Sequence, residues 1–143
     1  MNHSLRDKAI PPRPRWLPGA ALLAGAFGIA TVISGGRVLF GPEAARAAAG
    51  RVVPFVLWFN FLAGFAYLAA AAGLWRARRW AAPLALAIAA ATALTFLAFG
   101  AHVLLGGAFE ARTVAAMSLR TAFWGLVAAA AWRYLRRAVG PGG

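Results

Sequence analysis

Four long apolar stretches constrain the fold of this chain more than any other feature of its sequence. They occupy residues 17–34, 52–75, 80–105 and 113–132. A helix that crosses the hydrocarbon core of a bilayer needs about 20 predominantly apolar residues, and each stretch comes close to that length. Hydrophobic residues also make up 62% of the chain, whereas soluble domains contain roughly half. The sequence therefore predicts an all-α membrane protein with a single domain of four transmembrane helices.

Basic residues are distributed unevenly between the two ends of these predicted helices. Ten of them lie before the first helix, between the second and third, or after the fourth: Arg6, Lys8, Arg13, Arg15, Arg76, Arg78, Arg79, Arg133, Arg136 and Arg137. Four lie on the opposite side: Arg37, Arg46, Arg51 and Arg112. Short loops rich in lysine and arginine stay in the cytoplasm. The distribution thus predicts an antiparallel four-helix bundle with both termini in the cytoplasm.

The same distribution explains the formal net charge of +12. A soluble protein of that charge would be a candidate for nucleic-acid binding. That function requires a polar basic surface, whereas these arginines lie at the ends of apolar helices. We therefore expect the lipid bilayer as the main partner, together with a protein partner or further copies of the chain, and no nucleic acid.

The predicted periplasmic side carries one sizeable loop, from Gly35 to Arg51. Its segment PEAARAAAG begins with a proline, has an acidic residue in the first turn and ends with a glycine, as short helices do. We expect a periplasmic surface helix at residues 42–49. The pair Gly35-Gly36 is expected to form the turn that ends the first transmembrane helix.

The sequence lacks the residues that most catalytic sites need. It contains no cysteine, which excludes disulfides, thiol redox chemistry and thiolate metal sites. No nucleophile–base pair, carboxylate pair or phosphate-binding loop can be identified in it. Its two histidines, His3 and His102, lie on opposite sides of the predicted membrane, so we expect neither a haem nor another metal site within one chain. The protein is therefore expected not to be an enzyme and to need no cofactor of its own.

Arg120 lies inside the fourth predicted helix, in the segment MSLRTAFWGL. A charged side chain within the hydrocarbon costs several kcal/mol and usually has a partner or a function. At about 1.5 Å of rise per residue, Arg120 lies about 10 Å below the periplasmic end of its helix, and Asn60 in the second helix lies at a similar depth. Glu110 precedes the fourth helix and is the nearest acidic residue, so we expect it to pair with Arg120.

Helical spacing places these polar residues on inward-facing stripes. Arg120 shares one face of its helix with Thr113, Met117 and Trp124, at intervals of three and four residues. We therefore expect a periplasm-facing polar pocket formed by Asn60, His102, Glu110 and Arg120. Its floor is expected to consist of Tyr67, Phe99 and Trp124, and its roof of the loop 106–112.

A fixed cation and an amide in a wall of low dielectric would suit a ligand with an anionic or carbonyl-bearing head group. The alternative is a purely structural role, in which the polar residues form a clasp that ties the helices together. Gly25, Gly28 and Gly64 would permit close helix approach in either case.

One segment of the chain, WFNFLAGFAYLAAAAGLWRARRWAAPLALAIAAAT, covers residues 58–92. In it a polar residue, Asn60, is followed four positions later by Gly64. The helix then ends in Gly73-Leu74, and a basic turn, Arg76–Arg79, leads to a helix of alanine and leucine. The segment resembles the second and third helices of the DoxX-like family of small four-helix bacterial membrane proteins. Members of that family usually have glutamate where this chain has Asn60. The resemblance implies a bacterial inner-membrane protein and, as for some family members, a link with quinone-reducing oxidoreductases.

Three functions are compatible with these features. The first is a non-enzymatic inner-membrane protein that serves as an accessory subunit of a larger complex or binds a small ligand as a DoxX-like protein. The second is a small channel or transporter that works as an oligomer and uses Arg120 to select an anion or small solute. The third is a membrane subunit of an oxidoreductase that binds quinone between its helices. We expect the first of these.

Overall fold

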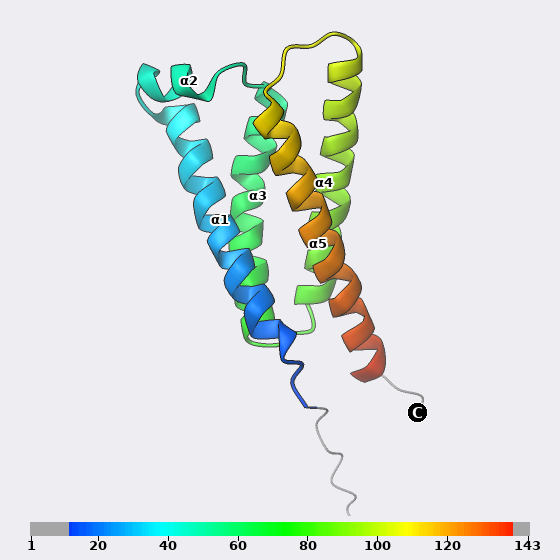
Figure 1. Ribbon diagram of the computed structural model, residues 1–143. Helices are drawn as coiled ribbons and strands as arrows, with labels where there is room; N and C mark the ends of the chain where they lie inside the picture. The colour runs from blue at the N-terminus through cyan, green and yellow to red at the C-terminus, as the bar shows by residue number, and fades with distance from the viewer. Residues whose placement is uncertain (1–11, 139–143) are drawn as a thin grey trace, which may run out of the picture.

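The structure is a computed structural model and describes residues 12–138, which form five helices (Figure 1). The helices are α1 (Trp16–Phe40), α2 (Glu43–Ala49), α3 (Pro54–Trp75), α4 (Ala81–Leu104) and α5 (Ala111–Ala138). No strand occurs in this part of the chain. By length and composition, α1, α3, α4 and α5 could each cross a membrane. The all-helical fold class is thus confirmed, and the four long helices are compatible with a multi-pass membrane protein.

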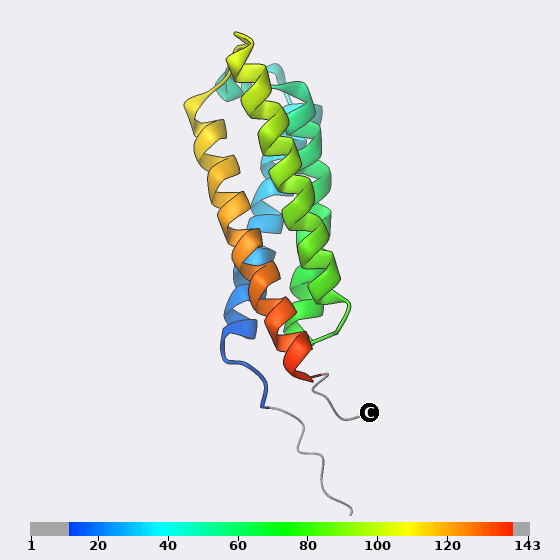
Figure 2. The ribbon, with the colours of Figure 1, turned by 90° about the vertical axis from the view of Figure 1, so that its right-hand side faces the viewer.

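The four long helices lie side by side, with α2 at one end (Figures 1 and 2). α1 and α4 run toward this end, named the α2 end, and α3 and α5 run away from it. The opposite end, named the terminal end, carries the first and last described residues and the turn between α3 and α4. α1 packs mainly against α3, and α5 packs mainly against α4. The bundle therefore consists of two helix pairs.

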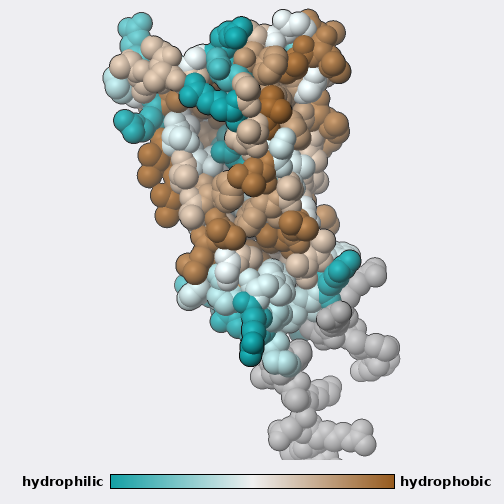
Figure 3. Space-filling view, in the orientation of Figure 1, coloured by the Kyte–Doolittle hydropathy of each residue, from teal (hydrophilic) through white to brown (hydrophobic). Residues whose placement is uncertain are grey.

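The surface of the molecule is polar at both ends and apolar between them. On the face seen in Figure 3, a belt of hydrophobic side chains separates hydrophilic groups at the α2 end from those at the terminal end. Leu94, Leu97 and Leu126 on the long helices are 67%, 71% and 73% exposed. Apolar surface on this scale is expected in contact with lipid rather than with water. Of the basic residues predicted at the terminal end, Arg6 and Lys8 lie outside the described residues.

Small residues bring α1 and α3 close together. A Cβ atom added to Gly64 would lie 2.7 Å from Cγ2 of Val32, and one added to Gly28 would lie 2.9 Å from the side chain of Leu68. Both distances are shorter than van der Waals contact, so a larger residue at either position would require the neighbouring side chain or helix to shift. Gly25 is less restricted, since its added Cβ would lie 3.8 Å from Ala71. The predicted close approach of helices at Gly28 and Gly64 is confirmed.

The prediction of a turn at Gly35-Gly36 is wrong, because α1 continues to Phe40. Gly35 is buried against α3, where an added Cβ would lie 3.2 Å from the Cβ of Phe61. Tertiary packing of this kind stabilises a helix beyond the intrinsic propensity of its residues. The chain then turns, and α2 occupies the segment in which a surface helix is expected. α5 also extends past its predicted end at residue 132, to Ala138.

Two apolar clusters hold the helices together. The larger one lies in the centre and the terminal half of the bundle and includes Tyr67, Leu74, Ile88, Trp124 and Val127. The smaller one joins α3, α4 and α5 near the α2 end and consists of Val53, Val56, Phe99 and Met117. α1 contributes only residues up to Phe27 to these clusters. Beyond Phe27, α1 packs on α3 through Gly28 and Gly35 but contributes to neither cluster.

Candidate binding pocket

A cavity of about 490 Å³ lies at the α2 end between α1, α3 and α5, with α2 above it. In Figure 3, hydrophilic groups interrupt the apolar surface where α1 and α5 face the viewer near this end. The polar lining residues are Thr31, Ser34, Asn60, Arg112, Thr113 and Arg120. The others are small or aliphatic: Gly35, Val38, Ala45, Ala48, Ala49, Val52, Val53, Val56, Leu57 and Ala116. Volume and composition are those of a small-molecule site.

Arg120 lies at the end of the cavity farthest from α2. The side chain is half-buried, and its Nη2 donates a hydrogen bond of 3.2 Å to Oγ1 of Thr31 on α1. Its Nε is buried and has no hydrogen-bond partner among the described residues. One helical turn below, the rings of Phe27 and Phe123 meet with centroids 5.3 Å apart and close the gap between α1 and α5. Arg120 thus presents an incompletely paired guanidinium at the floor of the cavity.

Asn60 faces the same cavity from α3. Its Oδ1 is buried and likewise lacks a hydrogen-bond donor in the described part of the chain. Buried polar groups in folded proteins nearly always have a hydrogen-bond partner, from the protein or from water. The unpaired atoms of Asn60 and Arg120 therefore indicate a place for water or a ligand. Of the four residues predicted to form a polar pocket, these two line the same cavity.

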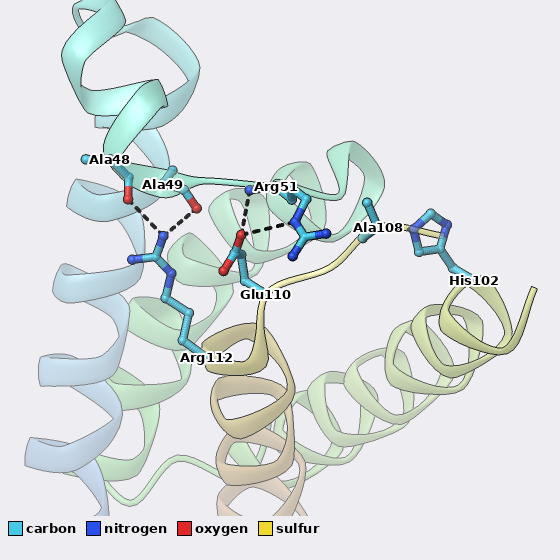
Figure 4. A network of polar contacts seen from close by, with 7 residues as sticks. All are labelled: Ala48, Ala49, Arg51, His102, Ala108, Glu110 and Arg112. Atoms are coloured by element: carbon cyan, nitrogen blue, oxygen red, sulfur yellow. Dashed lines mark hydrogen bonds and ion pairs between the residues drawn. The ribbon is translucent and has the colours of Figure 1, made fainter. Parts of the chain in front are cut away.

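The predicted ion pair between Arg120 and Glu110 is wrong. Oε1 of Glu110 instead accepts a hydrogen bond of 2.8 Å from the backbone N–H of Arg51 and lies 3.8 Å from Nε of the same residue (Figure 4). Glu110 precedes α5, and about ten residues of helix separate it from Arg120 by about 15 Å along the axis. The side chain of Arg51 is 72% exposed and that of Glu110 is 29% exposed, so this ion pair contributes little to stability.

Arg112 ties the beginning of α5 to the end of α2. Its Nη2 donates to the carbonyl oxygens of Ala48 at 2.8 Å and Ala49 at 2.5 Å (Figure 4). A cation at a helix C-terminus also interacts favourably with the helix dipole. α2 thereby forms the roof of the cavity, and the prediction of a roof from residues 106–112 is wrong apart from Arg112. Sequence reasoning placed Arg112 in the roof loop but missed its contact with α2, although a spacing in multiples of four places it on the same helical face as Arg120.

The remaining residues predicted for the pocket lie elsewhere. His102, at the end of α4, has its Nε2 3.1 Å from the carbonyl oxygen of Ala108 in the following loop and does not line the cavity (Figure 4). Tyr67, Phe99 and Trp124 are buried in the apolar clusters, so the prediction that they form the floor is wrong. Large aromatic side chains on inward faces bury most area against other helices, and here they fill the bundle.

A second group of polar atoms lies near Arg120, deeper in the bundle. The ring of Tyr67 packs on that of Trp124 at 4.9 Å, and the Tyr67 hydroxyl lies near Thr92 and within electrostatic reach of Arg120. The two hydroxyls and the indole N–H of Trp124 are buried and have no hydrogen-bond partner of good geometry within residues 12–138. Polar groups therefore continue from the cavity toward the centre of the bundle.

The chemistry that the cavity offers follows from its own residues. No group of three or more histidine, cysteine, aspartate or glutamate side chains in the described ranges is arranged to hold a metal ion. The guanidinium, amide and hydroxyl groups of the lining are suited to anions and carbonyl groups. No protein-family model, curated protein or solved structure matches the chain.

Proposed function

We propose that this protein is a small multi-pass protein of the bacterial inner membrane that binds a small ligand in the cavity between α1, α3 and α5. The proposal depends on Arg120, a half-buried cation in an apolar helix at the edge of a cavity of about 490 Å³. Charges within membrane-spanning segments are costly and usually have a function. Arg120 would hold an anionic or carbonyl group of the ligand, because its buried Nε–H has no acceptor. Asn60 would donate to the same group through its amide nitrogen, since a half-turn of the amide exchanges its oxygen and nitrogen.

The membrane arrangement that we propose is an antiparallel four-helix bundle with both termini in the cytoplasm. The predicted cytoplasmic side carries the excess of basic residues, and such segments remain in the cytoplasm. The cavity would then face the periplasm. The resemblance of residues 58–92 to DoxX-like proteins supports the same class, a non-enzymatic membrane protein that serves as an accessory subunit or binds a small ligand.

Reporter fusions test this topology. Alkaline phosphatase, which becomes active only in the periplasm, is expected to be inactive when fused after Gly143 and active when inserted between Gly106 and Gly107. A fluorescent protein that matures only in the cytoplasm is expected to give the opposite result at both positions. Phosphatase activity at the C-terminus would overturn the proposed orientation.

A panel of small anions tests binding at Arg120. The full-length protein in detergent is heated with acetate, benzoate, bicarbonate or chloride at one ionic strength, and unfolding is followed by tryptophan fluorescence. A ligand at about 100 times its dissociation constant stabilises a protein by about 2.7 kcal/mol. A bound anion is therefore expected to raise the midpoint of unfolding by several degrees. The rise is expected for the wild-type protein and for Arg133→Met, and not for Arg120→Met.

Arg133→Met is the matched control, because Arg133 is an exposed arginine of the same helix at the terminal end. An equal rise for Arg120→Met would place the anion at another site. If no anion raises the midpoint and no carbonyl compound is bound to the purified protein, the proposed function is wrong.

A quinone is the second candidate ligand, favoured by the apolar wall beside Arg120 and Asn60. Its carbonyl oxygens could accept hydrogen bonds from both residues, and its ring could contact Val53 and Leu57. Extraction of the purified protein with organic solvent would then yield quinone in stoichiometric amount, detected by its absorbance.

An anion channel is less well supported, because Phe27 and Phe123 close the cavity below Arg120. Anion flux into liposomes that contain the pure protein would favour the channel instead.

A further inference from the structure

The cavity has two chemically different parts along the helix axes. Arg120, Asn60 and Thr31 lie at its deep end. Toward α2 the walls of α1 and α3 become apolar, and alanines of α2 close the cavity above them: the apolar residues include Val38, Val53, Val56, Leu57, Ala45 and Ala49. At about 1.5 Å per residue, this apolar part extends about 10 Å from Asn60 to the beginning of α3.

The buried unpaired polar atoms of the described lining lie at its deep end. Near α2, the guanidinium of Arg112 already donates to two carbonyl oxygens. The hydroxyl of Ser34 donates to the carbonyl oxygen of Thr31 at 3.3 Å. Nε of Arg120 and Oδ1 of Asn60 are the buried lining atoms without a partner. An anion therefore gains more hydrogen bonds at Arg120 than at Arg112.

The charge of the lining also favours an anion. Arg112 and Arg120 are the charged residues among the described lining, and none of its side chains is acidic. Glu110, just before α5, is held outside the cavity by Arg51. A half-turn of the Asn60 amide exchanges its oxygen and nitrogen, so that this residue can donate to an anion as well. The deep end thus provides a cation and amide donor for one carboxylate.

We propose that the ligand is a carboxylate with an apolar body, bound with the carboxylate inward against Arg120 and Asn60 and with the body toward α2. This inference rests on the proposed function and names the ligand class for the same cavity. A short anion would satisfy Arg120 but leave the apolar walls in contact with water. The cavity of about 490 Å³ has room for roughly 16 waters at about 30 Å³ each, so a body of several carbon atoms fits.

Such a ligand could come from two sources, the periplasmic water or the bilayer. A soluble carboxylate has to fit completely beneath α2. A fatty acid from the bilayer has a longer chain, which would leave the cavity through the gap between α1 and α5, above the contact of Phe27 with Phe123. The chain length that binds best therefore separates the two sources.

Equilibrium dialysis of the full-length protein in amphipol against labelled straight-chain carboxylates, from acetate to palmitate, tests the proposal. Burial of one methylene group raises the affinity of a ligand about fourfold. The affinity for the carboxylate is therefore expected to rise by about this factor with each added methylene until the apolar part of the cavity is filled. Arg120→Met is expected to lose this binding and Arg133→Met to keep it. Octanol and octylamine, which lack the negative charge, are expected not to displace octanoate.

A second pair of variants tests the orientation of the ligand. Ala45→Phe adds a ring to the roof of the cavity, and Ala44→Phe adds the same ring to an exposed position of α2 that does not line it. Ala45→Phe is expected to reduce the affinity for octanoate to that for acetate and to leave acetate binding unchanged. Ala44→Phe is expected to bind both as the wild type does.

The outcomes separate this inference from the function on which it rests. Binding that depends on Arg120 but not on chain length would overturn the inference and leave the proposed function intact. Absence of Arg120-dependent binding for every carboxylate would overturn the inference. The unfolding midpoints with the small anions, and the search for a bound carbonyl compound, would then decide whether the proposed function holds. A plateau or a fall beyond octanoate supports a soluble ligand, whereas undiminished binding of palmitate supports a fatty acid from the bilayer.

Discussion

Replacement of Arg120 by methionine is expected to raise the stability of the protein while it abolishes ligand binding. Methionine keeps much of the side-chain length but removes a charge whose one hydrogen-bond acceptor in the described chain is Thr31. Exchange of a buried charged group for an apolar group of similar volume is often stabilising. The expected gain is about 1–3 kcal/mol in the free energy of unfolding. The midpoint of thermal unfolding of the ligand-free protein in detergent measures it.

Arg120→Lys is the matched control, since it keeps the charge and is expected to show no gain. A lower midpoint for Arg120→Met would contradict the prediction and would favour the structural clasp, in which Arg120 ties α5 to α1 through Thr31. A gain in stability together with a loss of binding is the usual behaviour of a functional site, where polar groups are kept for the ligand at the expense of stability.

Substitution of leucine for Gly64 is expected to destabilise the protein strongly. An added Cβ at this position would lie 2.7 Å from Cγ2 of Val32 and 3.2 Å from the carbonyl oxygen of Gly28. α1 and α3 would have to separate, and overpacking of this kind costs about 3 kcal/mol. The measured quantities are the midpoint of thermal unfolding and the yield of monodisperse protein after extraction in mild detergent.

Gly100→Leu is the control for this substitution, because an added Cβ at Gly100 in α4 would have no neighbour within 4 Å. The intrinsic helix propensity of leucine exceeds that of glycine by roughly 1 kcal/mol or less, so Gly100→Leu is expected to be as stable as the wild type or slightly more so. Equal stability of Gly64→Leu and Gly100→Leu would contradict the close packing of α1 on α3.

The long helices could be predicted from the sequence because apolar length alone identifies them. The ends of α3 and α4 differ from the predicted ranges by at most two residues. The end of α1 could not be predicted in the same way. Two consecutive glycines indicate a turn on local grounds, and their helical conformation depends on contact with Phe61 from another helix. Local signals determine helix ends only where tertiary packing does not intervene.

The candidate site was predictable to a similar extent. Depth and helical face are properties of single helices, and they correctly place Asn60 and Arg120 beside the same cavity. The partner of a charge depends on which helices are neighbours, and the acceptor for Arg120 is Thr31, 89 residues away in the sequence. An inward-facing stripe shows which residues avoid lipid. It does not show whether they line a cavity or, as Tyr67 and Trp124 do, fill a core.

The division of the bundle into two helix pairs has a mechanical consequence. The pair α1–α3 is connected to the pair α4–α5 by the short turn at the terminal end, and the cavity lies between α5 and the first pair at the opposite end. A rotation of about 5° about that turn would displace the α2 end by about 3 Å, given a helix length of about 33 Å. The hydrogen bonds of Arg120 to Thr31 and of Arg112 to α2 resist this rotation, as does the smaller apolar cluster, which joins α3 to α4 and α5. The cavity thus lies at the end that such a rotation would displace most. A molecule bound there would set the angle between the two helix pairs.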